Sequence, residues 1–144
     1  MIRYTETEEN YIKAIFHLQK QTAQVSTQEL SGSLQTKPAS VTDMLKKLKT
    51  KRLINYKPYH GFRLSAEGNR VALGIIRRHR LWEFFLSEKL DFNWDEVHEV
   101  AEQLEHVSSP KLIEKLDAYL GFPKLDPHGD PIPDQDGNFR NTIL

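Results

Sequence analysis

Two histidines and two glutamates fall on one face of a predicted helix in the segment HEVAEQLEH, residues 98–106. They lie at positions i, i+4, i+7 and i+8, which a helix with 3.6 residues per turn places on one side. These residues are His98, Glu102, Glu105 and His106. The apolar residues of the stretch fall on the other side, so the helix could pack on a core and still present all four polar groups. Imidazole nitrogens and carboxylate oxygens gathered in this way are suited to a divalent cation.

The preceding predicted helix contributes a second pair of such groups, His79 and Glu83, at i and i+4. The chain has no cysteine, so a metal site would use nitrogen and oxygen ligands, which favour Mn²⁺, Fe²⁺, Co²⁺, Ni²⁺ or Zn²⁺. We therefore predict one or two divalent sites on two adjacent helices. The alternative is an ordinary acidic helix face in contact with solvent.

The sequence contains no pattern typical of a catalytic site. The stretch HEVAE begins like the zinc-protease motif HExxH, but Glu102 stands where the second histidine would be. A glycine-rich phosphate loop, a GxGxxG fingerprint and a Ser-His-Asp order are also missing. We therefore expect that the protein is not an enzyme.

The net charge of zero hides two opposite halves. Residues 1–80 hold 15 Lys and Arg against 6 Asp and Glu, whereas residues 81–144 hold 5 against 14. The basic half indicates an anionic partner, with nucleic acid as the first candidate, and the acidic half with its histidines indicates cations. No apolar run approaches the roughly 20 residues that span a bilayer, and no signal peptide follows Met1. We therefore expect a cytoplasmic protein that does not contact a membrane.

The hydrophobic periodicity and the capping residues predict short elements followed by longer helices. In chain order these are helices over 6–19, 26–34 and 38–50, a two-stranded hairpin over 53–64, and helices over 65–89, 94–107 and 110–120. This order predicts a mainly α fold with a small β-hairpin wing: a winged helix-turn-helix over residues 1–70, then a helical domain over 71–123. We see no internal repeat, and from Phe122 onward we expect no regular structure.

The helix from Pro38 to Thr50 is the predicted recognition helix of a DNA-binding unit. Its core stripe is Val41, Leu45 and Leu48, which leaves small hydroxyl residues and lysines for base edges and phosphates. Lysine and arginine in the hairpin could reach the backbone beside the groove. The predicted DNA-contacting residues are Thr36, Lys37, Pro38, Ala39, Ser40, Thr42, Lys46, Lys47, Lys57 and His60.

The chain resembles the diphtheria toxin repressor family of iron- and manganese-dependent transcriptional regulators, from about Thr5 to Pro133. The motifs that carry the resemblance are TEENYIKAIFHL, KPASVTDMLKKLKTKRL, GFRLSAEGNRVA, RRHRLWEFFL, VHEVAEQLEHV and HGDPIP. The resemblance implies a homodimer that binds Fe²⁺ or Mn²⁺, becomes competent for double-stranded DNA, and occupies a palindromic operator of metal-uptake genes. It makes the second domain a dimerisation and metal-binding domain. It also implies a primary metal site of Asn10, Glu102, Glu105 and His106 and an ancillary site of His79, Glu83 and His98.

The chain departs from one or other branch of the family at positions 10, 13 and 102. Iron-type members have a methionine at the position of Asn10 and a cysteine at that of Glu102, whereas manganese-type members often have an aspartate at position 10 and a glutamate where Lys13 stands. The sulfur-free ligand set favours Mn²⁺ slightly over Fe²⁺, with Zn²⁺, Co²⁺ or Ni²⁺ as substitutes. Residues 124–144 are predicted to be an irregular tail or a linker toward an SH3-like domain that many relatives carry and this chain lacks.

Two other functions remain open from the sequence. A winged-helix regulator could sense a small organic effector between its helices, and a metal-dependent enzyme could carry a basic lobe. The apolar residues Leu81, Trp82, Phe85 and Leu86 could form the dimer surface, fill the core, or do both.

Overall fold

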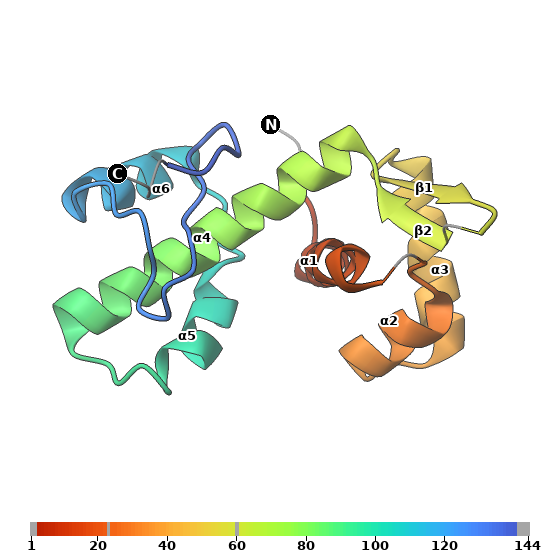
Figure 1. Ribbon diagram of the computed structural model, residues 1–144, viewed down its shortest axis with the longest axis horizontal. Coiled ribbons are helices and arrows are strands. Elements are labelled where there is room, and N and C mark those ends of the chain that lie inside the picture. The colour runs from red at the N-terminus through yellow and green to blue at the C-terminus, as the bar shows by residue number, and fades with distance from the viewer. Residues whose placement is uncertain (1–2, 23, 60, 141–144) are drawn as a thin grey trace. The chain divides into compact units, whose positions relative to one another are not determined.

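The computed structural model describes residues 3–22, 24–59 and 61–140. The chain forms two compact units, Met1–Ala72 and Leu73–Leu144, and the division falls within one long helix. No helix among the described residues is both long and apolar enough to cross a membrane. The elements confirm the predicted mainly α fold with a hairpin wing. They are α1 (Glu6–Gln21), α2 (Thr27–Leu34), α3 (Pro38–Thr50), β1 (Ile54–Lys57), β2 (Gly61–Leu64), α4 (Ala66–Leu90), α5 (Val97–Leu104) and α6 (Pro110–Tyr119) (Figure 1).

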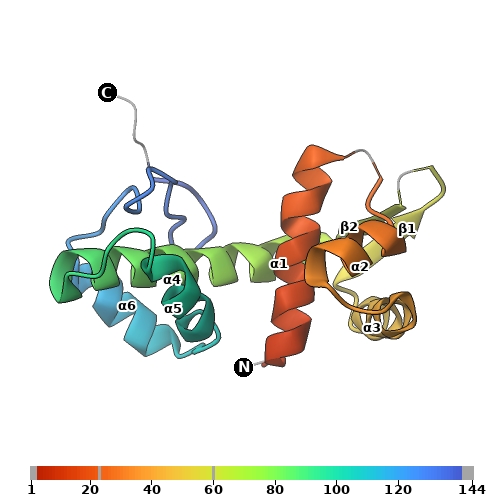
Figure 2. The ribbon, with the colours of Figure 1, turned by 90° about the horizontal axis from the view of Figure 1, so that it is seen from below.

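The first unit packs three helices and the hairpin around one core (Figure 2). Helix α1 contacts α2 and β2, α2 contacts α3, and α3 contacts β1. The predicted stripe of α3 is confirmed, because Val41, Leu45 and Leu48 are all buried. The opposite face of α3 is therefore left to solvent. Other buried residues of this core are Ile12, Ile15, Val25, Leu30 and Leu53.

Two capping boxes fix where the first helices begin. The Thr5 hydroxyl accepts the Glu8 backbone N–H while the Glu8 carboxylate accepts the N–H of Thr5. Ser26 and Glu29 repeat this exchange at the start of α2. Each box satisfies helix donors that would otherwise lack a partner, and the predicted starts of both helices are confirmed.

The wing is a regular antiparallel hairpin tied to the loop before α2. Tyr56 pairs with Phe62, and their rings lie 5.0 Å apart. The Phe62 N–H donates to the carbonyl oxygen of buried Val25 at 2.9 Å. Val25 thus forms an isolated β-bridge with the hairpin. Gly61 has a φ of 66°, and a Cβ at this position would overlap the Val25 carbonyl oxygen. The wing position therefore depends on glycine here.

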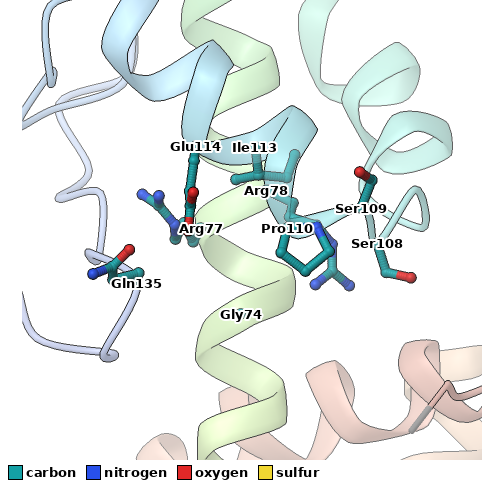
Figure 3. Close-up of a pocket in the computed structure, with 9 residues that line it drawn as sticks. All are labelled: Gly74, Arg77, Arg78, Ser108, Ser109, Pro110, Ile113, Glu114 and Gln135. Atoms are coloured by element: carbon teal, nitrogen blue, oxygen red, sulfur yellow. The ribbon is translucent and has the colours of Figure 1, made fainter. Parts of the chain in front are cut away.

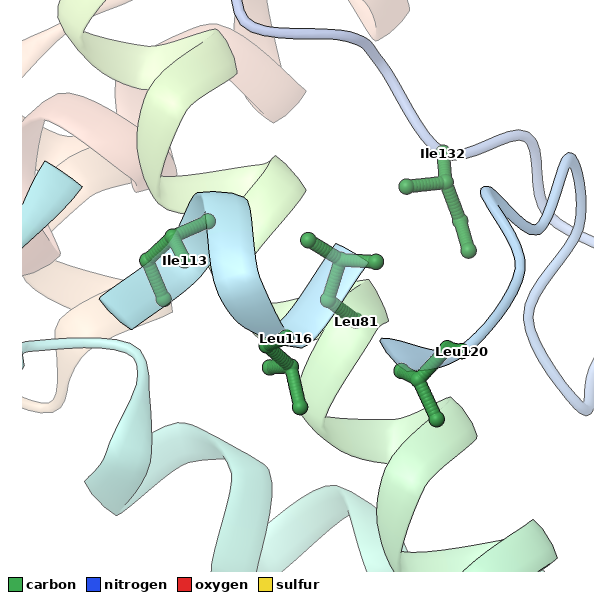
Figure 4. Packing of buried hydrophobic residues seen from close by; sticks show 5 residues of the cluster. All are labelled: Leu81, Ile113, Leu116, Leu120 and Ile132. Carbon is green, nitrogen blue, oxygen red and sulfur yellow. The ribbon is translucent and has the colours of Figure 1, made fainter. Parts of the chain in front are cut away.

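The second unit is built on the later turns of α4. Figure 4 shows Leu81 of α4 among residues of α6 and of the C-terminal segment. The full cluster of buried residues is Leu81, Ile113, Leu116, Leu120 and Ile132. The predicted apolar residues of α4 divide in two. Leu81 and Leu86 are 0% and 3% exposed and belong to this unit's own core, whereas Trp82 and Phe85 are only partly buried.

Helix α5 is shorter than the sequence predicts. The prediction ran from Trp94 to Val107, but α5 covers only Val97–Leu104. Residues 93–96 form a turn instead, in which the Glu96 N–H donates to the Asn93 carbonyl at 2.9 Å and the Glu96 carboxylate accepts the Asn93 N–H at 3.0 Å. At the other end, the Glu105 N–H still reaches the Ala101 carbonyl at 2.8 Å. Glu105 therefore keeps the helical phase on which the predicted metal face depends.

The C-terminal segment contains no helix or strand within its described part, yet it folds into two successive turns of the same design. Asp126 opens the first turn, and its Oδ1 accepts the N–H groups of His128 and Asp130, both at 2.9 Å. Asp134 opens the second, and its Oδ1 accepts the N–H groups of Asp136 and Asn138, both at 2.9 Å. The sequence shows no evident repeat here, because the two turns share only the spacing Asp-x-x-Gly-Asp/Asn.

Replacing Gly61 with alanine should destabilise the first unit. The new Cβ would overlap the Val25 carbonyl, and alanine would have to adopt a positive φ. We expect a loss of about 1–3 kcal/mol in the free energy of unfolding, measured by urea titration. Gly32→Ala in α2 is the matched control, because its Cβ would meet no atom within 4 Å; it should leave stability unchanged or raise it by up to about 1 kcal/mol. Equal effects of the two substitutions would contradict the proposed role of Gly61.

Replacing Glu8 with glutamine should weaken the fold in a pH-dependent way. Burial raises the pKa of the Glu8 carboxyl, but its contacts with Lys51 and Thr5 outweigh burial, so this pKa lies below its ordinary value. The ionised form therefore stabilises the fold above the unfolded-state pKa of about 4.5, and this stabilisation is lost as pH falls through the lower folded-state value. Melting curves of both proteins should differ at pH 7, and the difference should shrink as the pH falls through the folded-state pKa of Glu8. A constant difference across this range would refute the assignment.

Candidate metal centre and nucleic-acid interface

The buried carboxylate of Glu83 is surrounded by imidazoles. Its Oε2 lies 3.2 Å from His79 Nε2, 3.5 Å from His98 Nδ1 and 3.7 Å from His128 Nδ1. Glu83 is 2% exposed, and within the described part of the chain this oxygen has no hydrogen-bond partner of good geometry. A buried carboxylate oxygen without hydrogen bonds is costly. A cation at this point would satisfy both the oxygen and the nearby nitrogens.

Two overlapping sets of ligand atoms meet at Glu83, and we call their members together the Glu83 cluster. In each set, one ligand atom from every residue lies within 4.8 Å of the others. The first set is His79, Glu83 and His98, whose positions the sequence analysis singled out. The second set is Glu83, Asp126 and His128, of which Asp126 and His128 were not predicted. The stretch DPHGDPIP contains both residues, a histidine two positions after an aspartate, but nothing in the spacing linked it to a helix more than 40 residues earlier.

The second set is positioned by the first C-terminal turn. Asp126 Oδ1 orders the turn by accepting two backbone N–H groups. The His128 ring then lies edge-on to Trp94, with 5.1 Å between ring centres, and His128 Nε2 lies 3.1 Å from the Trp94 carbonyl oxygen. Because a carbonyl can only accept, this contact requires a proton on Nε2, and Nδ1 is the ring nitrogen that lies near Glu83. In the neutral ring, Nδ1 would therefore be available to bind a metal ion.

The remaining predicted ligands continue from the Glu83 cluster as alternating carboxylates and imidazoles. His79 Nδ1 lies 2.7 Å from Glu105 Oε1, and His106 Nε2 lies 3.8 Å from Glu105 Oε2. On the other side, His98 Nε2 lies 3.3 Å from Glu102 Oε1. The structure thus brings together six of the seven predicted metal residues. The seventh, Asn10, is half-buried on α1 in the first compact unit.

The protonation of His79 shows what a cation would replace. Burial alone would lower the pKa of His79, but its contacts with Glu105 and Glu83 raise it to about 9. Burial would likewise raise the pKa of Glu83, but the nearby His79 imidazole lowers it to about 2. Burial and the charge of Glu83 raise the pKa of Asp126. Without metal, a proton on His79 balances the buried carboxylates, and a divalent ion could take over this task by displacing it.

The residues present fit a divalent transition-metal ion. The donors are imidazole nitrogens and carboxylate oxygens, without sulfur, and they converge on an unsatisfied buried oxygen. This set suits Mn²⁺, Fe²⁺ or Zn²⁺. Arg78 adds a second layer of support, because its Nε donates to the Glu105 carbonyl at 2.6 Å.

A cavity of about 180 Å³ lies between α4, the start of α6 and Gln135 (Figure 3). Arg77 and Arg78 line it, but both have structural partners. Arg77 donates to the Asp117 carboxylate at 3.0 Å, and Arg78 donates to the backbone of Glu105. Glu114 adds a negative charge to the same wall. We assign this cavity a structural role only.

The predicted nucleic-acid contacts lie on two surfaces of the first unit. On and before α3, all of the predicted residues are exposed except Thr36, which is half-buried. On the wing, Lys57 is exposed and lines a cavity of about 270 Å³ together with Asn55, Arg63, Gly61 and Leu64. His60 lies outside the described residues. A cavity bordered by lysine and arginine is suited to a phosphate group.

Two family models match this chain, one after the other. The N-terminal DNA-binding domain of iron-dependent repressors matches residues 3–62. Their metal-binding and dimerisation domain matches residues 65–134. The junction between the two matches falls at residues 63 and 64, at the end of β2 and just before α4.

Individual proteins give the same picture. An uncharacterized HTH-type transcriptional regulator of Methanocaldococcus jannaschii is 33% identical over 113 residues, covering 78% of this chain and 90% of that protein. The iron-dependent repressor IdeR of Mycobacterium tuberculosis is 26% identical over 133 residues, covering 92% of this chain and 58% of that protein. A manganese-dependent transcriptional repressor, solved in complex with manganese, has 39% identity and a TM-score of 0.84, covering 93% of this chain and 62% of that one.

The chain therefore spans little more than half the length of IdeR and less than two thirds of the manganese-bound repressor. Within that span, the order of the matched domains is the order found here: a winged helix-turn-helix, then helices that carry the candidate metal centre. The chain belongs to the iron-dependent repressor family.

Proposed function

We propose that the protein is a cytoplasmic, metal-dependent repressor that binds an operator of metal-uptake genes as a homodimer when Mn²⁺ or Fe²⁺ is bound. The observation that carries this proposal is the buried Glu83 carboxylate oxygen, which three imidazoles approach within 3.7 Å. The same chain carries a winged helix-turn-helix with an exposed basic helix. A cation site and a DNA-binding unit in one chain are best explained by a cation that controls DNA binding.

The DNA-binding part of the proposal rests on shape and charge. Helix α3 buries one stripe and exposes its lysines and small residues, as a recognition helix must. The wing adds Lys57 and Arg63, which border a cavity of about 270 Å³. Phosphate contacts from these side chains would set the position of the unit, and α3 would read the base edges.

The metal-binding part of the proposal divides the alternating carboxylates and imidazoles into two sites. His79, Glu83, His98, Asp126 and His128 would hold one ion in the second unit. Glu102, Glu105 and His106 would hold another together with Asn10, as the relationship to the family implies. Metal can favour the DNA-competent state only if it binds that state more tightly than the other.

The donor set favours manganese slightly over iron in this proposal. Carboxylate oxygens suit Mn²⁺, and imidazoles suit iron and zinc as well. The chain is similar both to a repressor solved with manganese and to the iron-dependent repressor IdeR. Zn²⁺, Co²⁺ and Ni²⁺ could substitute in vitro, since affinity for such sites rises along the series from Mn²⁺ to Cu²⁺.

A double-mutant cycle on Glu83 and His128 tests the Glu83 cluster. Glu83→Gln keeps the side-chain shape but removes the charge, and His128→Ala removes one ligand of the second set. Each should weaken Mn²⁺ binding by at least roughly tenfold in isothermal titration calorimetry, and the double variant should lose less than the product of the two. Glu88→Gln is the control, because Glu88 is exposed on the same helix. Unchanged Mn²⁺ affinity in Glu83→Gln would refute the site.

Replacing Glu105 with glutamine tests the link between metal and DNA. Alanine would be a poor choice, because Glu105 is fully buried and holds His79. Glutamine keeps an acceptor for His79 but removes the charge that attracts a cation. We expect Mn²⁺-dependent binding to operator DNA, followed by fluorescence anisotropy at fixed salt, to weaken at least roughly tenfold. The dimer should persist in size-exclusion chromatography with light scattering, and an unaltered response to Mn²⁺ would refute the assignment.

A further inference from the structure

The outward face of the recognition helix carries one acidic residue, Asp43. It is the only acid in α3, whose sequence is PASVTDMLKKLKT. At 100° per residue, Asp43 lies about 200° from buried Val41, almost opposite the stripe that packs on the core. Its side chain is exposed. Asp43 therefore occupies the middle of the face that a recognition helix presents to the major groove.

The neighbours of Asp43 allow it to approach DNA closely. One turn earlier stands Ala39, which has only a methyl group, and one turn later stands Lys46; both are exposed. Although Lys46 and Lys47 lie at i+3 and i+4, neither forms an ion pair with Asp43 in the part of the chain that the structure describes. The predicted contact set contains only neutral and basic residues, so it leaves the central residue of the face without a role.

A carboxylate at this position needs a hydrogen-bond donor on the DNA. Phosphates repel it, and an ionised carboxylate can only accept hydrogen bonds. In the major groove the donors are the amino groups of cytosine (N4) and adenine (N6), whereas thymine O4 and guanine O6 and N7 are acceptors. Adenine presents its N7 acceptor beside N6, which would repel the second carboxylate oxygen. Cytosine is therefore the base that a carboxylate distinguishes best.

We propose that Asp43 is a specificity-determining residue that accepts a hydrogen bond from the amino group of a cytosine in each operator half-site. The assignment rests on the proposed function, since it requires α3 to lie in the major groove. The lysines of α3 attract any DNA sequence through its phosphates. Asp43 lowers this general attraction, and a C·G pair at the matching position restores the lost affinity. The acid thus converts a basic helix into a selective one.

The alternative is a solvated charge that faces no base, and it predicts a different effect of substitution. Removing such a charge would tighten binding to every sequence by the same factor, because only repulsion by phosphates would be relieved. Removing a base-reading carboxylate would instead change the preferred base. Asparagine is informative in this respect, because its carboxamide both donates and accepts and pairs well with adenine N6 and N7.

The experiment is a selection from a randomised duplex pool by the full chain with Mn²⁺ at fixed salt. Wild type, Asp43→Asn and Asp43→Ala are compared, with Asp95→Asn as the control because Asp95 is exposed in the second unit. We expect wild type and Asp95→Asn to enrich a C·G pair at one symmetry-related position. Asp43→Asn should shift that position toward A·T, and Asp43→Ala should make it indifferent, while all other positions stay unchanged.

Competition with defined duplexes gives the magnitude. Changing the selected C·G to T·A should weaken wild-type binding roughly 5- to 150-fold, and should change Asp43→Ala binding by less than about twofold. The same base preferences in all four proteins, with uniformly tighter binding by the Asp43 variants, would overturn the assignment and leave the proposed function intact. A wild-type chain that enriches no sequence with Mn²⁺ or Fe²⁺ would overturn both.

Discussion

The negative charge of Glu83, held where water cannot reach it, is the constraint on which the second unit depends. A carboxylate that is 2% exposed must be neutralised, and the chain provides three imidazoles around the same oxygen. Of these, His79 carries the compensating proton in the metal-free protein, since its pKa is raised to about 9. The proton on His79 balances part of the charge at this polar centre, and a divalent cation would balance it more completely.

Much of the first unit could be predicted because its signals are local. The starts of the first helices, the buried stripe of α3 and the hairpin each depend on residues close together in the chain, and the structure confirms all of them. The β-bridge at Val25 could not be predicted from the sequence, because it depends on Gly61 lying against the carbonyl of a residue 36 positions earlier in the chain. The predicted start of α5 was wrong for a local reason. Glu96 closes a turn with Asn93, whereas the apolar pattern alone indicated a helix there.

The candidate metal centre divides in the same way. Helical spacing identified His79 with Glu83 and His98 with Glu102, because partners at i and i+4 share a face whatever the rest of the fold does. That these pairs meet at one oxygen is a tertiary result, and so is the arrival of Asp126 and His128. Their turn is ordered by the Asp126 carboxylate, and the ring of His128 is oriented by a backbone carbonyl of Trp94. Contacts made by backbone groups do not appear in the spacing of side chains. The positions of Asp126 and His128 in the site could therefore not be predicted from the sequence.

The two halves of the chain solve opposite electrostatic problems with similar means. In the acidic second unit, imidazoles interleaved with carboxylates prevent mutual repulsion and create a preference for cations. In the basic first unit, lysines alone would give strong attraction to DNA that falls steeply with salt and ignores sequence. Asp43 at the centre of α3 places one charge of the opposite sign where the helix reads bases. In both units, a few side chains of the opposite charge weaken the general attraction to ions or to DNA. Selectivity results, because only the matching ligand compensates for the carboxylate: a cation at Glu83 or a suitable base at Asp43.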